Sequence, residues 1–364
     1  MVVYVWKCAN NQFNRIGVID NATSVIWVTR YNKAGEFELY IKATDELLAM
    51  LKGDVFLTRD DSNTTMYVEN VQLNTNNETG NYIIVSGRSA ECILGLRVIK
   101  QAIFTAVNTT VETILRTVVG MFTSAGSDPS IYDFRKFPFL SLGELHGWED
   151  YVTRQYTGKN LLDLVSDLCN EYNYGFNLTF DGNGFVFNLY QGTDRSYSQT
   201  ENTFVVFSPD FENLGDTEYK NDITNYANAA FVAGEGEGAD RKIYYWHTRD
   251  TDALSVREIW VDARNTSTNT DEGQLTTEEY RQQLKALGWE TIMQRKVVTT
   301  FNGTILNNSY IYGVDYNLGD KVSIRNEYGI TGNATITEIT EVEDETGYNL
   351  IPTLSSWEVI ETEV

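Results

Sequence analysis

The sequence predicts a mainly β protein with α+β insertions, in which two similar β-barrel domains flank helical and mixed αβ middle segments. Three observations predict this class. The first ninety residues consist of short β-branched and aromatic runs separated by polar turns. Capped amphipathic patterns typical of helices follow in the middle of the chain. A motif from the first ninety residues recurs near the C-terminus.

Length, charge and cysteine content restrict the class of protein. The 364 residues are enough for two or three domains of about 150 residues. There are 51 acidic and 28 basic residues, and the resulting formal charge of −23 opposes binding to nucleic acid or anionic lipid. The cysteines Cys8, Cys92 and Cys169 form no C-x-x-C pair, so neither a disulfide framework nor a zinc site is expected. This pattern fits assembly in a reducing cytoplasm.

No secretory signal and no membrane span are predicted. The N-terminus alternates like a strand and has no basic region before an apolar stretch. The most apolar long window, residues 103–122, contains the charged residues Glu112 and Arg116, which argues against a span.

Residues 1–88 are predicted to form the first β-barrel. Residues 24–30 are rich in β-branched side chains, and in residues 36–41 Phe37, Leu39 and Ile41 share one face. Further strand patterns separated by polar turns occupy residues 54–59, 65–73 and 82–87. Short strands at this spacing are typical of a closed or nearly closed barrel.

Residues 89–150 are predicted to be a helical insertion followed by a long loop. Thr109 and Glu112 have the spacing of a capping box before an amphipathic run that ends at Val119. The segment from Ser124 to Tyr151 has turn residues and aromatic side chains, which indicates an ordered excursion.

Residues 151–205 are predicted to be a small α+β domain, a helix followed by a hairpin. Asn160 is a capping residue for the helix, whose apolar side chains recur at helical spacing to Tyr172. The strand patterns 176–180 and 185–190 are joined by Asp181-Gly182-Asn183-Gly184, a strong hairpin signal.

An internal repeat predicts a second barrel over residues 206–364, with an inserted helix near 276–296 that Thr276 and Glu279 cap. Residues 53–61 (GDVFLTRDD) are echoed by residues 319–327 (GDKVSIRNE), a shift of 266. Residues 78–84 (ETGNYII) are echoed by residues 345–351 (ETGYNLI), a shift of 267. Two separate blocks at nearly one offset indicate two similar barrels.

No catalytic, cofactor-binding or metal-binding residue is assigned, no cofactor is predicted, and the chain is not predicted to be an enzyme. His146 and His247 lie far apart and in no metal-binding motif. The stretch 87–91 lacks the second glycine of a nucleophile elbow. The glycine-rich stretch 234–241 (GEGEGADR) carries three acidic residues that would repel phosphate, which favours a flexible acidic loop.

Several blocks in a fixed order resemble one family. They are residues 18–20 (VID), 24–31 (SVIWVTRY), 35–39 (GEFEL), 97–99 (RVI), 158–163 (GKNLLD), 207–209 (FSP), 234–241 (GEGEGADR), 260–264 (WVDAR) and 313–322 (GVDYNLGDKV). In this order they resemble the hub proteins of siphophage tail tips, which are relatives of the baseplate hub of contractile-tailed phages.

The resemblance implies a structural virion protein at the distal tail tip, assembled in the host cytoplasm. It would form a homotrimeric ring at the end of the tail tube, in contact with the distal tail protein ring and the tape measure protein. Two barrels in each of three chains would give pseudo-sixfold symmetry around a channel for DNA ejection. The sequence ends soon after the second barrel, so receptor-binding and lysin functions in host cell attachment are expected on separate proteins.

Two alternatives from other classes stay open at this point. A tail-associated cell-wall glycan hydrolase or lyase would need a cleft with one carboxyl group of raised pKa. A carbohydrate-binding adhesin would use tryptophan and tyrosine platforms such as residues 244–246. If the hub prediction holds, acidic residues in 235–240 and 341–345 are candidates for a channel wall that keeps DNA hydrated and mobile.

Overall fold

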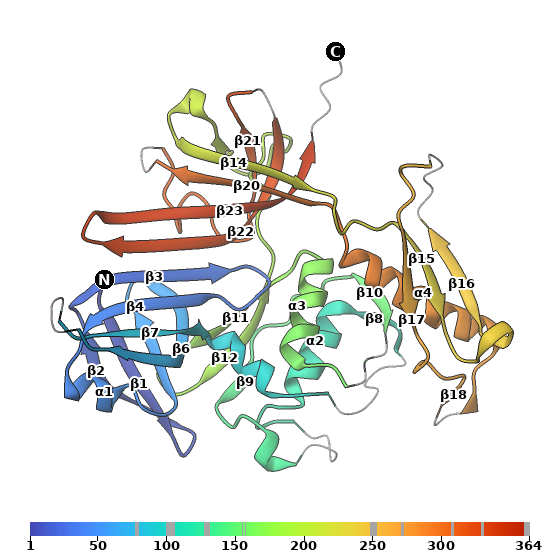
Figure 1. Ribbon diagram of the computed structural model, residues 1–364, viewed down its shortest axis with the longest axis horizontal. Coiled ribbons are helices and arrows are strands. Elements are labelled where there is room, and N and C mark those ends of the chain that lie inside the picture. The colour runs from blue at the N-terminus through green and yellow to red at the C-terminus, as the bar shows by residue number, and fades with distance from the viewer. Residues whose placement is uncertain are drawn as a thin grey trace.

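The structure is a computed structural model, shown in Figure 1, and it is mainly β. It describes residues 1–76, 80–99, 106–126, 132–154, 156, 158–247, 253–270, 273–306, 309–328 and 331–359. Most strands belong to one 13-stranded sheet with the order β14-β20-β23-β22-β3-β4-β7-β6-β5-β1-β2, in which β21 pairs with β22 and β13 with β21. The N-terminal and C-terminal strands are therefore joined in a single sheet.

The N-terminal half of this sheet has seven antiparallel strands around an apolar core. They are β1 (Val3–Ala9), β2 (Gln12–Ile19), β3 (Ala22–Arg30), β4 (Glu36–Lys42), β5 (Val55–Arg59), β6 (Ser62–Asn74) and β7 (Tyr82–Ser89). The short helix α1 (Asp45–Met50) connects β4 to β5 and is capped by Thr44. Phe37, Leu39 and Ile41 all point into the core, as their period-two spacing predicts.

The strand pairing of the N-terminal half is open. In the described part of the chain β2 pairs with β1 alone, while β3, at the other end of the series, pairs with β4 and with β22. The closed barrel predicted for residues 1–88 is therefore not confirmed. The reason is that β22 from the C-terminal half takes the free edge of β3.

The C-terminal half repeats this layout with a second apolar core. Its strands are β13 (Val206–Phe207), β14 (Leu214–Asp222), β20 (Val298–Ile305), β21 (Lys321–Arg325), β22 (Thr331–Asp344) and β23 (Gly347–Val359). Figure 1 shows them above β3 and β4, with β22 running alongside β3. This half is not a closed barrel by strand pairing either, because the series ends at β14, whose described pairing is with β20.

The middle of the chain packs on one shared core. Its elements are η1 (Ala90–Leu96), β8 (Ala106–Thr110), α2 (Val111–Gly120), η2 (Asp133–Arg135), β9 (Leu140–Leu142), β10 (Tyr151–Arg154), α3 (Leu161–Glu171), β11 (Gly175–Phe180) and β12 (Phe185–Tyr190). One apolar cluster contains side chains from η1, α2, α3, β11 and β12. The predicted segments 89–150 and 151–205 thus share a core, and their boundary stays a prediction.

The helix caps follow the sequence signals with one correction. Asn160 caps α3, and the hairpin β11–β12 forms as predicted. The cap of α2 is Thr110, whose hydroxyl accepts from the backbone N–H of Thr113 at 3.2 Å, and not Thr109. Glu112 makes no capping box because its buried carboxylate instead accepts from backbone N–H groups of residues 146–148.

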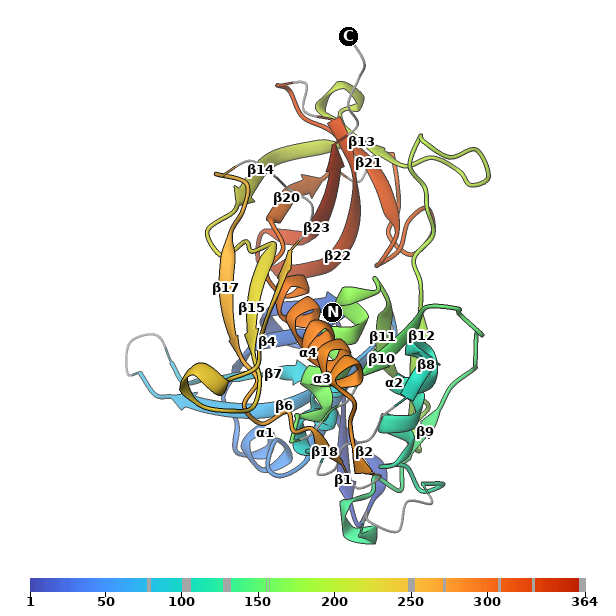
Figure 2. The ribbon, with the colours of Figure 1, turned by 90° about the vertical axis from the view of Figure 1, so that its right-hand side faces the viewer.

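The insertion between β14 and β20 is larger than the predicted helix. It contains β15 (Ala229–Ala233), β16 (Ile243–His247), β17 (Glu258–Asp262), the short strands β18 (Asn269–Thr270) and β19 (Gly273–Gln274), and α4 (Thr277–Met293). α4 begins with the predicted capping box of Thr276 and Glu279. It packs on β15 through a separate apolar cluster that includes Val232, Tyr280 and Leu284. This unit lies at the right of Figure 1 and faces the viewer in Figure 2.

The sequence repeat corresponds to two similar strand arrangements. The order β3-β4-β7-β6-β5 in the N-terminal half matches β14-β20-β23-β22-β21 in the C-terminal half. Gly53 and Gly319, which precede β5 and β21, both have φ of +91°, a conformation that favours glycine. The second repeated block is seen only in part, because residues 77–79 lie outside the described residues.

Candidate functional site: the junction between the two halves

The two halves meet where β3 pairs with the outer part of β22. One edge of β22 pairs with β23, and the other edge pairs with two strands in succession. Residues 331–335 pair with β21, and residues 338–343 continue past the end of β21 and pair with β3. The antiparallel register runs from Glu338 opposite Arg30 to Glu343 opposite Val25. We call these two paired segments, residues 25–30 and 338–343, the junction.

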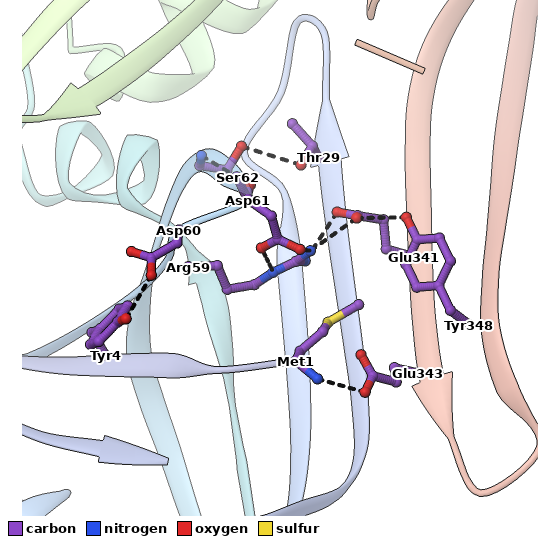
Figure 3. A network of polar contacts seen from close by, with 11 residues as sticks. Met1, Tyr4, Thr29, Arg59, Asp60, Asp61, Ser62, Glu341, Glu343 and Tyr348 are labelled. Carbon is purple, nitrogen blue, oxygen red and sulfur yellow. Dashed lines mark hydrogen bonds and ion pairs between the residues drawn. The ribbon is translucent and has the colours of Figure 1, made fainter. Parts of the chain in front are cut away.

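A buried arginine holds the centre of the junction (Figure 3). The guanidinium of Arg59 donates to both carboxylate oxygens of Glu341 at 3.1 and 3.0 Å, and to Asp61 at 2.9 Å. It also lies over the ring of Trp27, 5.2 Å from the centroid. The hydroxyl of Tyr348 donates to Glu341 at 2.9 Å. The side chains of Arg59 and Glu341 are 0% and 11% exposed, so this is a largely desolvated ion pair.

The contacts set the ionisation of the central groups. Burial of the guanidinium opposes its charge, but hydrogen bonds to Asp61 and Glu341 outweigh this and raise the pKa of Arg59. The hydrogen bond from Arg59 holds the pKa of Asp61 below its ordinary value. Burial, together with the Glu341 carboxylate, raises the pKa of Tyr348. All three shifts favour the charge state seen in the network, a cation between two carboxylates.

The flanks of the junction also pair acids of β22 with N-terminal cations. Arg30 donates to Glu338 at 2.5 Å and, through another nitrogen, to Glu36 at 2.8 Å. The α-amino group of Met1 donates to Glu343 at 2.5 Å. Of the predicted channel-wall candidates in 341–345, Glu341 and Glu343 are thus engaged inside the chain. That part of the channel-wall hypothesis is weakened, because their charges are already compensated.

Hydrogen bonds of the Glu235 side chain hold the glycine-rich loop 234–241 in place, whereas the sequence predicted a flexible loop. The carboxylate of Glu235 accepts from the Lys242 ammonium at 2.8 Å and from the hydroxyl of Thr268 at 2.8 Å. These contacts lower the pKa of Glu235 to about 2. Glu237 and Asp240 in the same loop are exposed to solvent.

The remaining candidates from the sequence are a histidine, a metal site and a cleft for glycan cleavage. His146 contacts the carbonyl oxygen of Leu189 through Nε2 at 2.8 Å and stacks on Trp148. No cluster of three or more potential metal ligands occurs within the described ranges. A surface hollow of about 720 Å³ borders α2, and its charged lining residue, Arg116, donates to the carbonyl oxygens of Gly143 and Glu144. The lining residues that the structure describes include no carboxylate pair of the kind that glycan hydrolysis requires.

Arg59 and Trp27 had no role predicted from the sequence, and Glu341 was expected only as a candidate for a channel wall. One signal was present, because Val55, Leu57 and Arg59 alternate on one strand and the first two point into the core. A charged residue at the third inward position indicates a buried ion pair. Its partner, 282 residues away along the chain, had no local signal.

Comparison with known proteins identifies the family of this chain. A family model for siphovirus ReqiPepy6 Gp37-like proteins matches residues 2–354. The chain belongs to this family. The resemblance to siphophage tail proteins that the sequence predicted is thereby confirmed, and so is the predicted location in the virion. No curated protein matches the chain. Among the described residues, no helix is both long and apolar enough to cross a bilayer.

Solved structures show that this family member has the fold of phage tail proteins. A tail protein from Neisseria meningitidis MC58 is similar with a TM-score of 0.55 and 14% identity, over 97% of this chain and 96% of that one. The 43 kDa tail protein of prophage MuSo2 from Shewanella oneidensis is similar with a TM-score of 0.51 and 12% identity, over 97% and 98%. Prophage tail protein gp18 from Listeria monocytogenes EGD-e gives 0.50 and 14%, over 98% and 94%. At such identities the likeness concerns the fold.

Proposed function

We propose that three copies of this chain form a ring with pseudo-sixfold symmetry at the distal end of the siphovirus tail tube. One observation carries the proposal: the strand order β3-β4-β7-β6-β5 recurs as β14-β20-β23-β22-β21 in the same chain. Two similar units per chain and three chains give six similar positions around an axis. Such a ring can match a sixfold tube on one side and a threefold tip on the other.

The ring would surround a channel for the tape measure protein and the genome, and would contact the distal tail protein ring. Receptor binding and cell-wall cleavage would belong to separate proteins, and the role of this chain would be structural. A formal charge of −23 suits a channel protein that DNA passes without specific binding, because acidic surfaces release no counterions from phosphate. Glu237 and Asp240 are exposed acids of the kind such a channel wall requires.

A cryo-EM reconstruction of the tail tip, with the mass of the purified protein measured at increasing concentration, tests the proposal. We expect three copies per tip, with the two halves of each chain at alternating sixfold positions. A tip with one or six copies, or one in which the halves lie at unrelated radii, would overturn it.

A further inference from the structure

We propose that the outer part of β6, residues 70–74, pairs antiparallel with β14 of a second copy of this chain, with Leu73 opposite Tyr219. The inference rests on the proposed ring and specifies which strands close it, and in which register. It follows from the junction, because the segments that form the junction inside the chain have equivalents, the outer part of β6 and the strand β14, that each pair with one strand in the described structure.

The first equivalence relates β6 to β22. β6 pairs with β7 with Val68 opposite Gly87, then skips one residue and resumes with Asn70 opposite Ser86. β22 pairs with β23 in the same way, with Ile336 opposite Leu354, a skipped residue, and a resumed register after it. A bulge at the same place in both hairpins fixes the alignment. Residues 70–74 therefore occupy the place of residues 338–342, which form most of the junction.

The second equivalence relates β14 to β3. In the N-terminal half Ala22 lies opposite Ile41, and the register shifts before Trp27 lies opposite Phe37. In the C-terminal half Leu214 lies opposite Ile305, and the register again shifts before Tyr219 lies opposite Phe301. Phe37 and Phe301 in turn pair with the equivalent residues Gly87 and Leu354. Tyr219 therefore occupies the place of Trp27.

The two equivalences together give the strand register expected between two copies. Inside the chain Glu341 lies opposite Trp27 and Glu338 opposite Arg30. The equivalent pairs between two copies are Leu73 with Tyr219 and Asn70 with Asp222. The remaining pairs of the transferred register are Val71 with Asn221, Gln72 with Lys220 and Asn74 with Glu218.

Both segments have one strand partner in the described structure and side chains that solvent reaches. In the described structure residues 70–74 pair with β7 alone, and β14 pairs with β20 alone. Leu73 is 45% exposed and Tyr219 is 40% exposed, whereas Trp27 at the junction is 0% exposed. Residues 70–74 of β6 extend past β5 and carry no charge, and natural proteins usually block such uncharged strand edges. We infer that this edge is left unblocked because another copy covers it.

The side chains suit the transferred register. Leu73 and Tyr219 would form an apolar pair at the centre, which is a favourable combination across strands. Neutral amides of β6 would face the charged residues of β14, so no like charges would lie opposite one another. The contact is heterologous, since β6 of one copy meets β14 of the next, and contacts of this type form a ring where the rotation from copy to copy closes and a filament where it does not. Junctions within and between chains would then alternate six times around a trimer.

A cysteine crosslink tests the register in purified protein and in assembled tails. The pair Gln72→Cys and Lys220→Cys joins opposite positions, both exposed in the chain. The pair Gln72→Cys and Glu218→Cys is displaced by two residues, which places the Cα atoms beyond the ~7 Å that a disulfide spans. We expect oxidation to link chains into dimers and trimers in the first variant alone. Mixing the two single-cysteine chains of the first pair must give dimers that contain one of each.

A second variant pair tests the edge without relying on a disulfide. Leu73→Lys places a charge at the centre of the proposed contact, and Val18→Lys, on the exposed edge strand β2, is a control because both residues are 45% exposed. We expect Leu73→Lys to weaken trimer formation at least tenfold and to leave the melting temperature of the monomer unchanged. Val18→Lys should leave trimer formation unchanged.

The outcomes separate this inference from the proposed function. A threefold ring that forms normally with Leu73→Lys, or that crosslinks only through the displaced pair, would overturn the inference and leave the ring in place. Matched crosslinks in an assembly with another copy number would support the contact and overturn the trimer. If Val18→Lys breaks the assembly and Leu73→Lys does not, β2 is the closing strand and the inference is wrong.

Discussion

The junction and the two outer edges use equivalent strand positions with opposite chemistry. At the junction, Trp27 is 0% exposed and faces Glu341, whose charge a buried arginine compensates. At the equivalent outer positions stand Tyr219 and Leu73, which are 40% and 45% exposed. A junction formed during folding can bury an ion pair, because both partners are always present. The two equivalent positions at edges that must stay in solution before assembly instead carry partly exposed apolar side chains of moderate size, set among polar neighbours.

The largest expected effect is the loss of Trp27. Trp27→Ala removes a fully buried ring from the junction and should lower the free energy of unfolding by about 3–5 kcal/mol, because the cavity cannot refill. Tyr219→Ala, at the equivalent outer position, should change it by less than about 0.5 kcal/mol. Denaturant unfolding of the monomer measures both values.

A conservative variant separates volume from the tryptophan N–H. Trp27→Phe keeps most of the buried volume and should recover most of the loss. Equal destabilisation by Trp27→Ala and Tyr219→Ala would contradict the contrast between junction and edge.

The second effect concerns the central ion pair. Glu341→Ala leaves the Arg59 guanidinium buried with Asp61 as its remaining carboxylate partner in the network, and should cost about 3 kcal/mol. Leu73→Ala, the equivalent outer change, should leave the stability of the monomer nearly unchanged. The double variant Arg59→Met/Glu341→Leu should restore most of the loss in a double-mutant cycle, because no buried charge remains unpaired. If the double variant is as unstable as Glu341→Ala, the loss of stability comes from lost packing and not from an unpaired buried charge.

Local signals were enough to predict the three longer helices α2, α3 and α4, the hairpin and the repeat, but not the short helix α1 or the contacts that join the two halves. Asn160 and Thr276 cap helices as predicted, since capping depends on residues within one turn. The repeated Gly-Asp turns mark β5 and β21 because a positive φ restricts the residue type. The junction pairs β3 with β22, about 300 residues later, and no local pattern specifies which edge a strand meets. The predicted closed or nearly closed barrels are not confirmed, because the strand pairing joins the two halves in one open sheet.

A smaller effect is expected at the flank of the junction. Arg30 and Glu338 are 25% and 26% exposed, so solvent screens much of their attraction. A double-mutant cycle with Arg30→Gln and Glu338→Gln should give a coupling of about 0.5–1 kcal/mol. The coupling should fall in high salt, whereas the coupling between Arg59 and Glu341 should change little, because ions screen buried pairs less. Equal salt dependence of the two couplings would remove the distinction between centre and flank.

The smallest effect is the contribution of Asp61 to acid sensitivity. Its carboxylate is 66% exposed, and the hydrogen bond from Arg59 lowers its pKa below the ordinary 3.8. A carboxyl group with a lowered pKa in the folded state stabilises the fold fully above its ordinary pKa, and this contribution is lost as the pH falls through the lowered value. Asp61→Asn should therefore reduce stability slightly, by less than about 1 kcal/mol at pH 7, and should flatten the acid limb below about pH 4. In an Arg59→Met background the same substitution should change neither, because the cation that lowers the pKa is gone. An unchanged acid limb in Asp61→Asn, measured by denaturant unfolding from pH 3 to 7, would show that Glu341 alone balances the buried arginine and that Asp61 lies outside the junction energetically.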